Sequence, residues 1–177
     1  MLIAGIDPGK KHLAVCVVDT ADNRIVQWQL LNVDDTSAGA FVRSIRGAVE
    51  GEVVKCRRVY IERQPPLNSS MCRVQYFLQM YLEMRVPACE VVIVQAAKRT
   101  RYLKARAPEF PGKMMLFDTY AQRKKSSVAF VDHVLATGDT SCDETIRSRF
   151  TTAVKRDDYA ESFLLAHIHV SECAEEE

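Results

Sequence analysis

The sequence predicts an α/β domain with a five-stranded mixed sheet, in which three antiparallel strands come first and two parallel strands follow. The first observation is a series of three apolar runs separated by short polar turns, as in an antiparallel meander. The second is the alternation of strand-like and helix-like patterns further along the chain. That alternation is typical of parallel strands whose connecting helices cover both faces of a sheet.

The five strands are expected at residues 2–8, 12–19, 24–33, 53–61 and 89–94. The last of them is almost wholly apolar, which favours a buried central strand. Six helices are expected from apolar spacing and polar caps, at residues 37–49, 69–86, 96–107, 122–136, 144–153 and 156–173. We expect residues 1–177 to form a single domain, with a disordered acidic tail at about 172–177.

The helix predicted at residues 69–86 carries more apolar side chains than one core-facing side requires. Its stripe of Val74, Phe77, Leu78 and Tyr81 is accompanied by three methionines. This surplus indicates a helix that is shared between the core and a partner.

The charge of the chain is unevenly distributed. The formal net charge is only +1, but residues 98–125 hold nine Lys and Arg against Glu109 and Asp118. A locally basic surface favours binding to a polyanion, and a solvated helix face is the alternative.

The six cysteines are scattered and include no CxxC pair, so we expect reduced thiols, an intracellular protein and no zinc site. The first residues already belong to a strand, which leaves no room for a signal or transit peptide. No apolar run approaches the length of a membrane span, and no membrane partner is expected.

Four acids fall at the ends of predicted elements. Asp7 ends the first strand, Glu62 ends the fourth, and Asp158 and Glu161 share one face of the last helix. Asp7 also suits a simple turn, and Asp157, which could share that face, is explained by the dipole of the helix.

If these four acids converged, their negative charges would repel one another unless cations were present. Hard oxygen ligands suit Mg²⁺ or Mn²⁺, and two such ions about 4 Å apart support phosphodiester hydrolysis. Lys98, just after the fifth strand, is a candidate to stabilise the transition state or protonate the leaving group; a contact with backbone phosphate, or a plain surface lysine, is the alternative.

Four segments resemble one known family. They are Gly-Ile-Asp-Pro-Gly (5–9), Val-Tyr-Ile-Glu-Arg-Gln (59–64), Ala-Ala-Lys-Arg-Thr-Arg-Tyr-Leu (96–103) and Lys-Arg-Asp-Asp-Tyr-Ala-Glu-Ser-Phe-Leu (155–164). Together they resemble Holliday junction resolvases of the RuvC-like RNase H superfamily, most closely the poxvirus-type and mitochondrial branch.

The resemblance implies an RNase H-like fold and a homodimer that cuts two opposing strands of a four-way DNA junction with two Mg²⁺ ions. It implies metal ligands at Asp7, Glu62, Asp158 and Glu161, with Lys98 as the active-site lysine. Glu161 stands where the family usually has Asp, so its contact with a metal is either direct or through water. Some mitochondrial members have an N-terminal extension that is not seen here, which favours a viral or phage source. For a viral protein, the expected location is the host-cell cytoplasm.

The remaining expectations concern surfaces. Basic side chains are expected to grip the phosphates of branched DNA, namely Lys98, Arg99, Arg101, Lys104, Arg123, Lys124 and Lys125. The resemblance makes the 69–86 helix a dimer helix, with Val74, Phe77, Leu78 and Tyr81 at the interface.

Three alternatives stay open at this point. A ribonuclease H-like enzyme that cuts RNA–DNA hybrids would use the same acids. A sugar-kinase or actin-like ATPase also begins with a Gly-Ile-Asp-Pro-Gly type of hairpin, but it requires a second domain and a phosphate loop. A non-catalytic junction-binding module would keep the basic surface and would have no use for converging acids.

Overall fold

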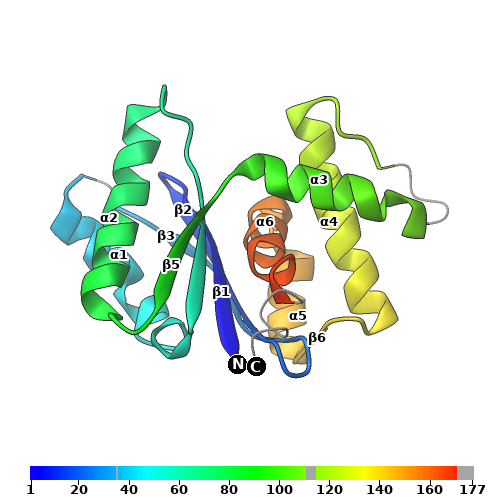
Figure 1. Ribbon diagram of the computed structural model, residues 1–177, viewed down its shortest axis with the longest axis horizontal. Coiled ribbons are helices and arrows are strands. Elements are labelled where there is room, and N and C mark those ends of the chain that lie inside the picture. Colours follow the sequence, from blue (N-terminus) through cyan, green and yellow to red (C-terminus); the bar gives the residue numbers. More distant parts are fainter. Residues whose placement is uncertain (35, 111–114, 171–177) are drawn as a thin grey trace.

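A computed structural model of the chain describes residues 1–34, 36–110 and 115–170. A six-stranded sheet stands between two layers of helices (Figure 1). Its strands lie in the order β5-β4-β1-β2-β3-β6, and their bounds are β1 Leu2–Asp7, β2 His12–Asp19, β3 Arg24–Asn32, β4 Arg58–Glu62, β5 Glu90–Val94 and β6 Ser141–Cys142.

The strand directions confirm the predicted mixed sheet. β1, β2 and β3 form an antiparallel meander, and β4 and β5 are added in parallel on the other side of β1. The sheet has one strand more than predicted among the described residues, because Ser141 and Cys142 pair with Arg24 and Ile25 inside a segment expected to be a loop. Two residues are too few to leave an alternating pattern in the sequence.

Two other details of the sheet differ from the prediction. The fourth strand begins at Arg58, since Val53–Lys55 form a short 3-10 helix (η1) whose Val53 side chain is buried in the core. The apolar strand β5 is an edge strand, and its middle residues are only half-buried. Apolar β-branched residues favour a buried strand, and in both places tertiary packing overrides that preference.

The helices occur where they were predicted, within a few residues at most ends. They are α1 Ala38–Val49, α2 Ser69–Arg85, α3 Ala96–Arg106, the 3-10 turn η2 Ala107–Glu109, α4 Tyr120–Thr137, α5 Glu144–Thr152 and α6 Arg156–His167. The predicted caps Ser37 and Asn68 accept hydrogen bonds from the first turns of α1 and α2. α6 ends at His167, and residues 171–173 of the predicted last helix, like the predicted acidic tail, lie outside the described residues.

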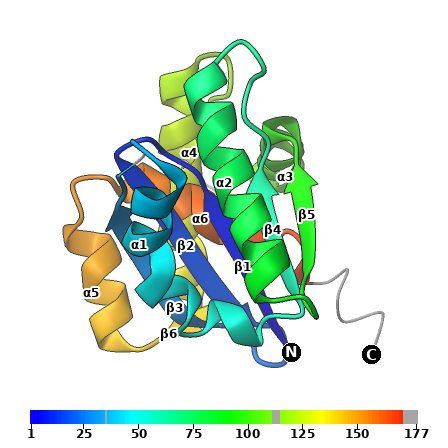
Figure 2. The ribbon, with the colours of Figure 1, turned by 90° about the vertical axis from the view of Figure 1, so that its left-hand side faces the viewer.

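Helices cover both faces of the sheet, as Figures 1 and 2 show. On one face α1 and α2 bury Phe41, Ile45 and Leu82 against β1, β2 and β4. On the other face α6 crosses β1 and β2, and α4 and α5 pack around it. Trp28 of β3 anchors that second core: its indole donates to the carbonyl of Tyr159, 3.0 Å away, and its ring stacks on Phe150.

The apolar side chains of α2 are divided between the core and the surface. Val74 and Leu78 are fully buried in this chain and serve its own core, so the structure offers no exposed surface at these two predicted dimer contacts. Phe77 and Tyr81 are half-buried. The side of α2 that faces outward instead carries Tyr76, Met80 and Met84, which are 64%, 49% and 77% exposed.

A glycine determines how closely α6 approaches β1. A Cβ atom on Gly5 would lie 2.1 Å from the Ser162 carbonyl oxygen and 2.7 Å from the Ala166 nitrogen. Only glycine therefore allows the helix backbone to rest on the strand at this point. This contact brings the first turn of α6 close to the end of β1, where the predicted acids lie.

Candidate active site

The predicted acids converge where β1 and β4 end beneath α6. The parallel register places Ile6 beside Ile61, so Asp7 and Glu62 follow on adjacent strands at the same edge of the sheet. Carboxylate oxygens of Asp7, Asp158 and Glu161 all lie within 4.8 Å of one another. A side-chain hydrogen bond links Asp7 to Glu62. The structure thus brings together all four acids.

The cluster is costly to ionise completely. Burial raises the pKa of Asp7 well above its usual value, the charges of Glu62 and Glu161 raise it further, and Arg99 opposes the shift. The pKa of Glu161 is raised chiefly by burial, against the lowering effect of Arg99 and Lys124. Carboxylates held this close in a semi-buried position fit a hard divalent cation such as Mg²⁺ or Mn²⁺.

Arg99, predicted as a DNA contact, lies within the acid cluster. It is only 8% exposed and donates two hydrogen bonds of 3.0 Å to the two carboxylate oxygens of Glu62. Its Nη2 also lies 3.6 Å from Oε1 of Glu161. The structure thus pairs this residue with acids of the cluster, and its contact with phosphate stays a prediction. The signal was present, since Arg99 lies four residues before Leu103 and shares its inward face of α3.

Lys124 is the second cation of the cluster. From α4 its ammonium donates to a carboxylate oxygen of Asp157 and to Oδ1 of Asp158 at 3.2 Å, and it lies 3.9 Å from Glu161. Burial works against its charge, but the hydrogen bond to Asp157 and the nearby carboxylates raise its pKa above the usual value. Its sequence position suggested a surface phosphate contact and gave no sign of this pairing.

Lys98, the lysine predicted to assist catalysis, has different neighbours. Its Nζ lies 3.3 Å from Nδ1 of His169, and the His169 ring stacks on Tyr60 at a centroid distance of 3.8 Å. Lys98 thus lies beside the histidine after α6, whereas Lys124 contacts the acids. The geometry favours Lys124 as the lysine of this site.

The other predicted DNA contacts lie on the outer faces of α3 and α4. Arg101, Lys104 and Lys125 are exposed. Arg123 is half-buried and donates to the carbonyl oxygens of Phe117 and Asp118 at 3.2 and 3.5 Å, so part of its guanidinium fixes the segment before α4. Three of these side chains are therefore available to a polyanion as they stand.

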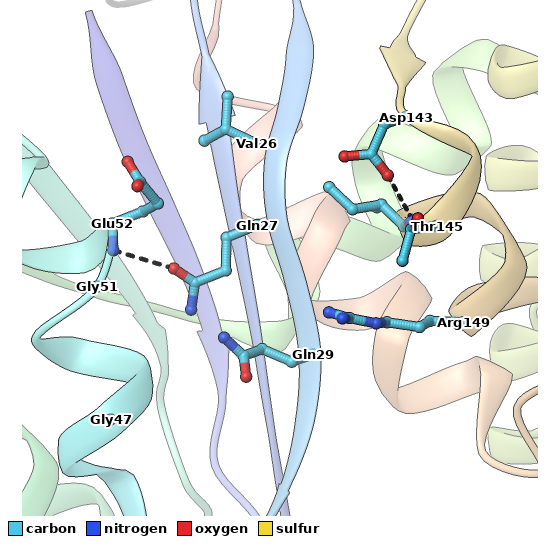
Figure 3. A pocket seen from close by; sticks show the side chains of 10 residues that line it. Val26, Gln27, Gln29, Gly47, Gly51, Glu52, Asp143, Thr145 and Arg149 are labelled. Carbon is cyan, nitrogen blue, oxygen red and sulfur yellow. Dashed lines mark hydrogen bonds between the residues drawn. The ribbon is translucent and has the colours of Figure 1, made fainter.

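A separate polar pocket of about 300 Å³ lies at the β3 side of the sheet, between α1 and α5 (Figure 3). Gln27 crosses it to donate to the carbonyl of Ala48 and to accept from the backbone nitrogen of Glu52, at 3.2 Å each. These bonds hold the end of α1. None of the converging acids lines this pocket, so it belongs to the scaffold and not to the acid cluster.

A family model for the poxvirus A22 protein matches residues 1–172 of the chain. The chain belongs to this family. The match agrees with the resemblance that the four sequence motifs indicated, and it extends over the acid cluster and both cations described above. No match was found among the curated proteins.

Solved structures show the same fold. A crystal structure of the fowlpox virus resolvase with its substrate Holliday junction DNA matches at 20% identity and a TM-score of 0.62, covering 98% of this chain and 99% of the other. Thermus thermophilus RuvC in complex with a Holliday junction matches at 19% identity and a TM-score of 0.63, covering 99% and 96%. The predicted RuvC-like RNase H fold is thereby confirmed.

The described helices also bear on the membrane prediction. None of the helices within residues 1–34, 36–110 and 115–170 has the length and apolarity that crossing a membrane requires.

Proposed function

We propose that this protein is a structure-selective endonuclease that resolves four-way DNA junctions through paired, symmetric hydrolysis of phosphodiester bonds. The observation that carries the proposal is the convergence of Asp7, Glu62, Asp158 and Glu161 in a poxvirus A22 family chain. The fold it shares with a resolvase and with RuvC, both solved with Holliday junctions, supports the choice of substrate.

The acids have a defined part in the proposed reaction. Asp7, Glu62, Asp158 and Glu161 would hold up to two Mg²⁺ ions, with Mn²⁺ as a substitute. Such ions supply Lewis-acid charge that polarises the scissile phosphate and lowers the pKa of a water nucleophile. The acids would place these ions at the edge of the sheet, where β1 and β4 end, and the phosphate would be held there through the ions.

Lys124 is proposed to stabilise the charge that develops on the phosphate or to protonate the leaving oxygen. Its ammonium already lies 3.2 Å from Asp158 and 3.9 Å from Glu161. A cation at this distance from the acids would also be close to a phosphate bound through metal ions at this site. Lys98 is then left with a role beside His169 or at the DNA backbone.

Exposed cations of α3 and α4 would bind the phosphates that flank the cut. Arg101, Lys104 and Lys125 are the side chains placed for this. Each neutralised phosphate releases counterions, so the affinity for the junction should fall steeply as salt is raised.

Symmetric cutting requires two sites, which a homodimer supplies. The exposed side chains Tyr76, Met80 and Met84 give α2 an apolar outer face, with Phe77 and Tyr81 at its margin. We place the dimer contact on this face. Five cysteines among the described residues are free thiols, which supports an intracellular, reducing location such as the host-cell cytoplasm.

The experiment that tests the proposal compares three labelled substrates, namely an immobile four-way junction, a linear duplex and an RNA–DNA hybrid. Each is incubated with the protein in Mg²⁺ and in chelator. We expect paired, symmetric nicks in the junction only, and we expect chelation to remove them. Cutting of the hybrid alone would assign a ribonuclease H-like activity, and tight junction binding without cutting would leave a binding module.

A further inference from the structure

The acid cluster contains a buried arginine, Arg99, that is hydrogen-bonded to both oxygens of one predicted metal ligand, Glu62. Arg99 donates through Nη1 and Nη2 to both carboxylate oxygens of Glu62, at 3.0 Å each. The side chains of Arg99 and Glu62 are only 9% and 13% exposed. Each oxygen of Glu62 therefore already accepts a hydrogen bond from Arg99, and a further hydrogen bond links this carboxylate to Asp7.

The other three acids of the cluster are close to one another and are less engaged by Arg99. Asp7, Asp158 and Glu161 have carboxylate oxygens within 4.8 Å of one another, and Glu62 is not part of this group. Arg99 reaches only Glu161 of the three through an ion pair, at the longer distance of 3.6 Å. In this arrangement Asp7, Asp158 and Glu161 can provide three oxygen ligands to one ion, whereas the carboxylate of Glu62 is paired with Arg99.

An arginine is well suited to hold a carboxylate in this way. Its guanidinium stays charged at any pH that a protein meets, and its planar fork matches both oxygens of a carboxylate. A lysine would offer one point of charge and would leave an oxygen of Glu62 open. Removing one partner from a buried ion pair leaves the other charge uncompensated, so Glu62 would gain strongly from another cation.

We propose that Arg99 is a built-in cation that sets the order in which this site takes up divalent ions. The first ion binds to Asp7, Asp158 and Glu161. A second ion requires Glu62 and must compete with the charge and hydrogen bonds of Arg99 for its oxygens, so it binds more weakly. This inference rests on the proposed metal site and assigns to Arg99 a positioning role within it.

The test is a titration of the full-length, DNA-free protein with Mn²⁺, in which the free ion is measured by electron paramagnetic resonance. The wild-type chain should bind one ion tightly and a second at least about tenfold more weakly, the scale of coupling between close charges. Arg99→Gln should tighten the second ion by about tenfold, because Glu62 is released. Arg106→Gln, which removes the exposed pair with Glu109 at the other end of α3, is the matched control and should bind as wild type does.

A second variant covers the case in which Arg99→Gln does not fold. Arg99→Lys keeps the charge but loses the fork, and its affinity for the second ion should fall between those of wild type and Arg99→Gln. Equal affinities for the second ion in wild type and in the folded variants would overturn the inference. Failure of the wild-type chain to bind any Mn²⁺ would instead overturn the proposed metal site.

Discussion

Two cationic side chains, Arg99 and Lys124, lie among the carboxylates of the candidate site. The apolar spacing of its helix indicated that Arg99 points inward, whereas nothing in the sequence indicated this for Lys124. Arg99 is paired with Glu62 and Glu161, and Lys124 is paired with Asp157 and Asp158. Both were predicted as surface contacts to phosphate. A basic segment shows how much charge is present, but only the faces of α3 and α4 decide which cations point inward.

Replacement of the two lysines distinguishes their roles. Lys124→Ala should lower the rate of junction cleavage by about 100-fold or more, because it removes a cation that stabilises the reacting phosphate. Lys98→Ala should lower it far less, since its Nζ lies 3.3 Å from Nδ1 of His169, whereas Lys124 donates to Asp158. Single-turnover cleavage at saturating enzyme measures both, and a larger loss in Lys98→Ala would reverse the assignment.

The four acids illustrate what the sequence could predict at this scale. Asp7 and Glu62 each follow an apolar run, and Asp158 and Glu161 share a helix face, so the pattern alone predicted their convergence. It could not predict that Glu62 is paired with an arginine. That contact depends on how α3 leaves the edge strand β5, which no local pattern encodes.

At the scale of elements, the contact between β1 and α6 holds the site together. Gly5→Ala should destabilise the protein by about 1–3 kcal/mol or more, because the new Cβ meets the backbone at Ser162 and Ala166 and the helix must move away. Gly47→Ala is the matched control: its Cβ meets nothing within 4 Å, and alanine is the better helix former by up to about 1 kcal/mol. Urea denaturation measures both, and equal stabilities would contradict this account of Gly5.

The end of α6 predicts a dependence of stability on pH. His167 stacks on Phe163, its Nδ1 has no hydrogen-bond partner in the described part of the chain, and burial followed by the charge of Arg106 lowers its pKa to about 4. The unfolded chain protonates this imidazole near pH 6.5, and the folded chain does so only near pH 4. Between these values the unfolded state binds more protons, so stability should fall as the pH is lowered.

His167→Phe should remove that contribution. The wild-type protein should lose up to about 3 kcal/mol more than the variant between pH 6.5 and pH 4, as the shift in pKa implies. Carboxylates contribute equally to both proteins, so the difference between their stability curves isolates His167. Parallel curves would show that His167 titrates normally.

The elements that the sequence failed to predict are short or depend on tertiary contacts. β6 has two residues, and η1 replaces the first part of a strand that its valines suggested. The long helices were predicted with their caps, because the spacing of apolar residues can be recognised over ten or more residues. The edge position of β5 could not be predicted from its apolar sequence, because an edge strand with half-buried middle residues can be as apolar as a central one.

At the scale of the whole molecule, the outer face of α2 is expected to join two copies. Met80→Lys with Met84→Lys should convert a dimer into a folded monomer, because both side chains are exposed and charges there oppose burial against a partner. Leu78→Lys should unfold the chain instead, since Leu78 is fully buried. Light scattering with circular dichroism reports mass and folding, and an intact dimer in the double variant would move the interface elsewhere.

The most direct test of the central claim, that the converging acids cut DNA junctions, is the Asp7→Asn variant. Its junction binding and its Mg²⁺-dependent cleavage are measured on the same labelled four-way junction. Asparagine keeps the shape of the side chain and removes the charge, so the account predicts no detectable cleavage and an affinity for the junction close to that of wild type. Full cleavage by Asp7→Asn would contradict the account, because the acid at the end of β1 would then have no part in the reaction.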